Sequence, residues 1–181
     1  MTGNHGSGAH PWSFPVSVAK ISASGSHVAF EADASQRAAL AEMGSLRDVQ
    51  SASAVFDLTH ARGGAIQVHG RVRAVVGQDC VVTLEPISTT IDEEIDAVFA
   101  EPDTGGAAVK PKTNDDDEEP DPPELIVNGV IDLGKLAADW FFLGIDPYPR
   151  KPDAVFQEDS TQNDPEDHPF AALKALKPSK S

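Results

Sequence analysis

The sequence predicts an α+β fold: an antiparallel sheet, with barrel-like closure as one option, carries a few short helices and is interrupted by a disordered acidic loop. The main observation is the stretch 64–100, where apolar and polar residues alternate. A period of two is typical of a strand with one buried and one exposed face. The second observation is the helical spacing of apolar residues in 133–143. Three strands from the first stretch are enough to found a sheet, and the other segments are expected to cover it.

The segments before this stretch predict two strands and one helix. Residues 14–21 alternate and predict the first strand, and 28–31 predict the second. Asp33 followed by Gln36 resembles a helix N-cap with its capping-box partner. We therefore expect a short helix at 34–43, which is rich in Ala and Leu and ends before a glycine.

The central strands come next in the chain. Residues 49–60 and 66–76 each predict a strand. Gly-Gln-Asp at 77–79 predicts a turn, after which 80–84 resumes as the second arm of a hairpin. Residues 91–99 predict a further strand with an acidic outer face. The apolar face of the first of these strands is expected to consist of Ala52, Ala54, Phe56 and Leu58.

The last part of the domain predicts a strand, a helix and an extended segment. Residues 125–127 form a short apolar run and predict a strand. Asp132 is a credible N-cap for a helix at 133–143, which a glycine follows. Residues 146–152 contain three prolines and are not expected to be helical, because proline fixes φ and lacks the N–H donor. We expect this segment to lie as an extended strap.

We expect one α+β domain at residues 11–156, preceded by a flexible N-terminus at 1–10. Inside the domain, 101–123 has a run of acids and no apolar periodicity, which predicts a disordered insertion. Residues 157–168 predict a polar linker, and 169–177 predict a short amphipathic helix.

The chain is strongly acidic, with a formal net charge of −15. General nucleic-acid binding needs a broad positive surface, so this charge argues against it. The sequence has no apolar run near the ~20 residues that span a bilayer and no secretory-signal pattern at its N-terminus. One cysteine excludes an internal disulfide framework. We expect a cytoplasmic protein without membrane contact.

One basic cluster stands out inside the domain. His69, Arg71 and Arg73 share the outer face of one predicted strand. Such a row can grip phosphates, and arginine does so with two hydrogen bonds. The row can equally pair with acids on the adjacent strand, and we favour this structural role slightly. The acids concerned are Asp92, Glu94 and Asp96.

The terminal helix at 169–177 is the second candidate contact. One side of this helix carries Phe170, Leu173 and Leu176, and Lys174 and Lys177 lie elsewhere. A helix below about 12 residues is marginal in water. We therefore expect it to dock, either on its own sheet or on a partner.

Cys80 is the single cysteine of the chain and therefore its one candidate for a nucleophilic thiol. A reactive thiol needs a nearby base or cation, and His60 and His69 on predicted neighbouring strands could approach it, with Asp79 adjacent. A buried strand cysteine is the simpler interpretation, and we favour it. The scattered histidines and single cysteine show no paired ligand spacing, so we expect no metal site.

Three ordered motifs resemble the YceD family of large ribosomal RNA subunit accumulation proteins, in an alphaproteobacterial form. They lie at 78–86 (QDCVVTLEP), at 131–152 (from IDLG to DPYPRKP) and at 169–177 (PFAALKALK). Many relatives carry Cys-x-x-Cys at the first motif, whereas this chain has Gly77 in place of the first cysteine. This departure argues against a metal or redox role. The resemblance implies a role in the accumulation or processing of large-subunit ribosomal RNA, and it implies no enzymatic activity.

We therefore expect a non-catalytic factor for 23S ribosomal RNA accumulation and large-subunit assembly. Its expected partner is large-subunit ribosomal RNA or a basic ribosomal or assembly protein. We expect no cofactor, no metal and no small-molecule substrate. The alternative is a cysteine-dependent enzyme that uses Cys80.

Overall fold

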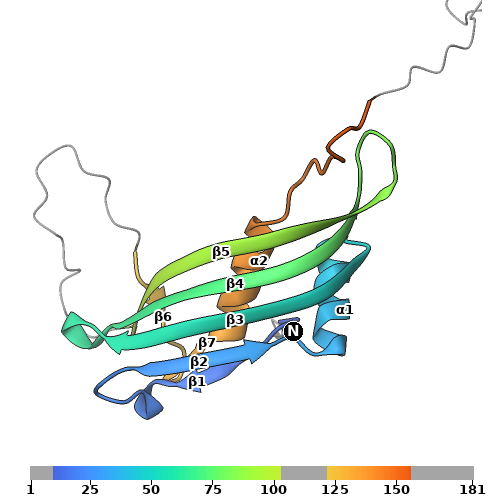
Figure 1. Ribbon diagram of the computed structural model, residues 1–181. Helices are drawn as coiled ribbons and strands as arrows, with labels where there is room; N and C mark the ends of the chain where they lie inside the picture. The colour runs from blue at the N-terminus through green and yellow to red at the C-terminus, as the bar shows by residue number, and fades with distance from the viewer. Residues whose placement is uncertain (1–9, 103–121, 156–181) are drawn as a thin grey trace, which may run out of the picture.

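The protein is a mostly antiparallel α+β structure, as predicted (Figure 1). The computed structural model describes residues 10–102 and 122–155. One sheet has five strands in the order β2-β3-β4-β5-β6, and β1 pairs with β7 in a second sheet. The larger sheet ends at β2 and β6 and does not close into a barrel among these residues. The elements are β1 (Pro15–Ser17), β2 (Ser26–Glu31), α1 (Ala34–Met43), β3 (Asp48–His60), β4 (Ile66–Asp79), β5 (Pro86–Ala100), β6 (Glu124–Leu125), β7 (Val130–Asp132) and α2 (Leu133–Leu143), with 3-10 turns at Val18–Lys20 and Arg62–Gly64.

The core lies between one face of the five-stranded sheet and α2, which crosses behind the long strands in Figure 1. Phe56 of β3, Val72 of β4 and Ile95 of β5 are completely buried. Leu133 and Phe141 of α2 are equally buried, so the helical stripe and the strand alternation meet. Burial of each such side chain contributes about 1.5–3 kcal/mol. The opposite face carries mostly polar and charged side chains, together with the exposed Val55 and Val98.

The predicted helix starts are confirmed. Asp33 accepts from the Gln36 amide at 2.8 Å, and the Gln36 side chain accepts from the Asp33 amide at 2.9 Å, which completes the capping box of α1. Asp132 caps α2 by accepting from the amides of Gly134 and Lys135 at 3.0 and 3.1 Å. These bonds satisfy amides that a helix N-terminus otherwise leaves without partners.

Asp132 also joins the N-terminal segment to α2. Its carboxylate accepts from the Ser13 hydroxyl and from the Phe14 amide, both at 2.7 Å. Burial acts to raise the pKa of Asp132, but these hydrogen bonds outweigh it and hold the pKa below its ordinary value. A β-carbon at Gly134 would lie 2.5 Å from the Phe14 nitrogen, so glycine is required where this segment crosses the helix.

The strand predicted at 14–21 is shorter than expected. Only Pro15–Ser17 is extended, and it pairs with β7, outside the main sheet. The Val18 amide donates to Gly129 at 2.9 Å, and the chain then turns through a 3-10 turn, with Ile21 donating to Val18. The partner strand β7 has three residues, so pairing cannot continue along the rest of the alternating stretch.

The predicted hairpin turn is wrong in position. β4 runs through 77–79 and ends at Asp79, and Cys80–Glu85 is the connection to β5. Gly77 lies within β4, where it pairs with Asp48 of β3 and with Ser88 of β5, so it forms no turn. The connection closes through bonds from the Cys80 amide to Glu85 (2.9 Å) and from the Leu84 amide to Cys80 (2.8 Å).

The strand predicted at 125–127 is displaced to β6 at Glu124–Leu125. It runs parallel to the end of β5, and the chain then turns at Asn128 and Gly129, both with positive φ. The predicted insertion at 101–123 lies almost wholly outside the described residues, as do the linker at 157–168 and the terminal helix at 169–177. In the described part of the chain, no helix is long and apolar enough to cross a membrane.

Candidate functional site

The exposed face of β4 and β5 carries a basic row directly opposite an acidic row. In the strand register His69 faces Asp96, Arg71 faces Glu94 and Arg73 faces Asp92. The sequence placed both rows correctly, because each strand keeps strict alternation over these positions.

The two rows form ion pairs, so the cross-strand pairing that we favoured is confirmed. Arg71 lies 3.0 Å from Asp92 and 3.7 Å from Glu94, and Arg73 lies 3.3 Å from Asp92. His69 lies 3.4 Å from Asp96 through Nδ1. Each of these side chains is at least 40% exposed, so each pair contributes at most about 1 kcal/mol to stability. Their larger effect is that both arginines are already engaged by carboxylates of the same chain.

Cys80 lies in the β4–β5 connection and is completely buried. The Lys151 amide donates to its Sγ at 3.4 Å. The Thr83 side chain, followed by the Lys151 amide, lowers the pKa of Cys80 to about 6, which outweighs the opposite effect of burial. The thiol is therefore held by hydrogen bonds in a position that favours its thiolate.

The expected approach of His60 or His69 to Cys80 is wrong. His60 pairs with Ile66 at the opposite end of the sheet, where its ring contacts the Ile21 carbonyl at 3.3 Å. His69 precedes Cys80 along the extended strand β4 by about 35 Å at the usual rise per residue. A histidine-activated thiol is therefore absent from the described structure.

The strap at 146–152 packs against this connection, and we call the contact the hairpin–strap junction (Cys80–Glu85 with 146–152). The Val81 amide donates to the Pro149 carbonyl at 2.9 Å. The Gln78 side chain donates to the Asp146 carbonyl at 2.8 Å. Segments almost seventy positions apart in sequence are thus joined through backbone carbonyls of the strap, which is how an extended strap without its own secondary structure keeps one position.

An ion pair closes the junction from outside. Lys151 Nζ lies 2.8 Å from Glu85 Oε2, and both side chains are about half exposed. The hydrogen bond from Lys151 lowers the pKa of Glu85, and the same bond raises the pKa of Lys151. Arg150 is exposed, and no carboxylate of the described residues lies within ion-pair distance of it.

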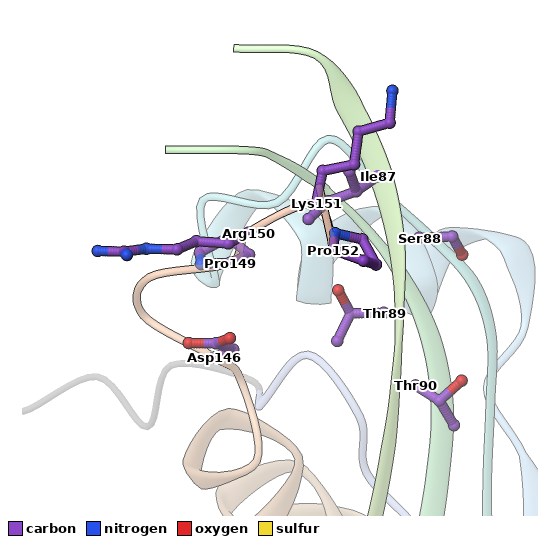
Figure 2. A pocket seen from close by; sticks show the side chains of 9 residues that line it. All are labelled: Ile87, Ser88, Thr89, Thr90, Asp146, Pro149, Arg150, Lys151 and Pro152. Carbon is purple, nitrogen blue, oxygen red and sulfur yellow. The ribbon is translucent and has the colours of Figure 1, made fainter. Parts of the chain in front are cut away.

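A shallow cavity of about 330 Å³ separates the strap from the start of β5. Figure 2 shows its lining: 87–90 on one side, and Asp146 with 149–152 on the other. The Arg150 side chain extends away from β5 in this view. The described residues contain no group of three or more His, Cys, Asp or Glu side chains that could hold a metal ion.

Sequence reasoning found the basic row but missed the junction. Of the predicted contact residues, His69, Arg71 and Arg73 share one exposed face, and the terminal residues lie outside the described part of the chain. The signal for the junction was present, because its two sides fall in two of the resembling motifs. The predicted terminal contact residues that lie outside the described part of the chain are Phe170, Leu173, Lys174 and Lys177.

A family model described as large ribosomal RNA subunit accumulation protein YceD matches residues 68–177. The match covers more than half of the chain and includes most of β4, all of β5 and α2, and both sides of the hairpin–strap junction. No curated protein and no solved structure matches the chain.

Proposed function

The chain belongs to the YceD family, whose name implies involvement in large-subunit ribosomal RNA accumulation, and on this premise we propose a non-catalytic role in assembly of the large ribosomal subunit. In this role the chain raises the amount of 23S ribosomal RNA by binding a partner during assembly in the cytoplasm. The partner is a basic ribosomal or assembly protein.

The observation that supports a protein partner is the pairing of the basic row. An RNA phosphate at Arg71 or Arg73 would have to displace Asp92 or Glu94 and would then lie beside these acids. The net charge of −15 adds long-range repulsion between the chain and RNA. A basic protein is instead attracted to the acidic chain, because complementary charge accelerates their encounter.

Cross-linking in cells tests this proposal. The chain is purified under denaturing conditions after cross-linking. The recovered RNA and protein are then quantified and compared with those from cells that were not cross-linked. We expect a basic ribosomal or assembly protein to dominate and the 23S to 16S ratio to fall on depletion of the chain. Recovery of 23S RNA in excess of protein would refute the protein partner, and an unchanged 23S to 16S ratio would refute the role itself.

The lowered pKa of Cys80 is the one observation that favours the alternative of a cysteine-dependent enzyme. The thiol has no exposed surface and no histidine beside it. Conversion of Cys80 to Ala separates the two functions, because a binding factor retains its effect on 23S RNA and an enzyme loses it.

A further inference from the structure

We propose that the free edge of β5 binds an extended, Lys/Arg-rich segment of the partner protein by strand addition. This inference rests on the proposed function and specifies the partner's chemistry and where it binds.

β5 is the outermost long strand of the sheet (Figure 1). β4 pairs with one side of it from Pro86 to Phe99. On the other side β6 pairs only with Phe99 and Ala100, so among residues 10–102 and 122–155 the edge from Pro86 to Val98 has no strand partner. Such an edge presents a row of unpaired N–H and C=O groups to another chain. β6 demonstrates that this side of β5 accepts a strand.

Two hydrogen bonds identify the backbone groups that point to this edge. The Ala100 carbonyl accepts from the Ile126 amide at 2.8 Å, so Ala100 and every second residue before it point toward the β6 side. The bond from Cys80 to Glu85 at 2.9 Å gives the same alternation from the other end, because it makes Ile87 and Thr89 the residues that bond to β4. The residues that face the free edge are Ser88, Thr90, Asp92, Glu94, Asp96 and Val98.

The start of the edge has room for an added strand. The cavity of about 330 Å³ lies between 87–90 and the strap, so the strap leaves this part of β5 uncovered. Figure 2 shows the Thr89 side chain on the strap side of β5, with Asp146 across from it, and the Ser88 and Thr90 side chains on the other side of the strand. An incoming backbone can therefore run from this cavity along β5 toward β6.

The acidic side chains along this edge of β5 favour a basic strand as its partner. The residues that offer edge backbone groups also carry the acidic row, in which Asp92 is 41% exposed and Glu94 66% exposed. A carboxylate accepts about four hydrogen bonds, so these acids retain acceptor capacity beyond Arg71 and Arg73. Lys or Arg at alternate positions of an added strand would lie beside them, which is the favourable cross-strand arrangement. A second copy of this chain would place acids beside acids, which is unfavourable. RNA lacks the alternating amide donors and acceptors that this edge would pair with.

The test uses the full-length chain and a fluorescent peptide of alternating Lys and Thr, about as long as the free edge. A second peptide has the same sequence with N-methyl groups at alternate residues, which keeps the charge and removes donors. Thr90→Pro removes an edge N–H without removing a bond to β4, and Thr90→Ala is its control. Glu94→Lys reverses a charge on this edge, and Glu31→Lys makes the same change on β2 at the opposite edge. Circular dichroism establishes that each variant is folded.

We expect the Lys–Thr peptide to bind, and we expect N-methylation, Thr90→Pro and Glu94→Lys each to weaken binding by about tenfold or more, as loss of one or two hydrogen bonds or charge contacts does. Thr90→Ala and Glu31→Lys should leave affinity within about twofold. Amide exchange at Thr90 and Glu94 should be fast in the free chain and slow with peptide.

Four results would overturn the proposal. These are equal affinity for the N-methylated peptide, tighter binding of a single-stranded RNA oligonucleotide, a dimer that Thr90→Pro abolishes, and edge amides that are already protected in the free chain. Complementation then distinguishes this site from the proposed function. Full restoration of 23S RNA by folded, peptide-deficient Thr90→Pro refutes the edge site alone, whereas unchanged 23S RNA on depletion of the chain refutes the proposed function alone.

Discussion

Replacement of Cys80 by Ala is the sharpest test of what the hairpin–strap junction does. The substitution removes one completely buried sulfur and the acceptor of the Lys151 amide at 3.4 Å. This bond is long, and a sulfur accepts hydrogen bonds only weakly, so its loss adds little to the loss of packing. The expected loss is therefore that of a modest core truncation, of order 1 kcal/mol in the free energy of unfolding. For a domain of this size it lowers Tm by about 2–8 °C.

The loss should depend on pH. The pKa of Cys80 is lowered from its ordinary value to about 6 in the folded protein, first through Thr83 and then through the Lys151 amide. A group with a lowered pKa contributes stability that is fully present above its unfolded pKa, about 8.5 for a thiol, and that is lost as pH falls through the folded value. The wild type should thus gain stability over Cys80→Ala as pH rises from about 5 to about 9.

Chemical denaturation of both proteins across this pH range measures the difference directly. A stability difference that stays constant with pH would refute the thiolate assignment while leaving the packing role intact. Cys80→Ser is the matched control for a polar, non-ionised acceptor. If folded Cys80→Ala is as defective as a deletion in 23S accumulation, then the thiol has chemistry and the non-catalytic role is wrong.

Three further predictions concern the framework and the tail. Gly70→Ala should cost about 1–3 kcal/mol, because its β-carbon would overlap the Phe56 ring, and thermal melts measure the loss. Asp132→Ala should destabilise more than Asp33→Ala, which should cost about 1 kcal/mol, because Asp132 joins the N-terminal segment to α2 as well as capping it; equal losses in urea titrations would contradict this. Truncation after Asp167 should leave Tm within a few degrees and impair large-subunit assembly in sucrose gradients, and a destabilised chain with normal subunit levels would show the reverse.

Local sequence patterns predicted most of the long strands and both helix starts. The alternation through Val68, Val72 and Ile91 fixed two strands and their buried faces, because a strand repeats every two residues whatever its neighbours are. The caps at Asp33 and Asp132 placed both helix starts, since a cap needs only amides two or three residues away. The opposite rows of charge on β4 and β5 followed from the same period.

Elements that depend on distant partners could not be read from the sequence. The turn after β4 lies at Cys80–Glu85, because β4 and β5 stay paired as far as Asp79 and Pro86 and the connection is held by the Pro149 carbonyl of the strap. Among the described residues, the edge of β5 before Phe99 lacks a strand partner because β6, which runs parallel to β5, begins at Glu124 opposite Phe99.

The sequence by itself thus determined most of the long strands and both described helices, the faces that they bury, and the acidic charge of the chain. The tertiary structure decided between the two roles that the sequence left open for the arginines, and it alone showed that Cys80 is remote from the described histidines and which backbone groups of β5 have no strand partner among the described residues. The physical reason is range: periodicity and capping act within a few residues, whereas ion pairing, thiol environment and edge exposure depend on contacts between segments far apart in the chain.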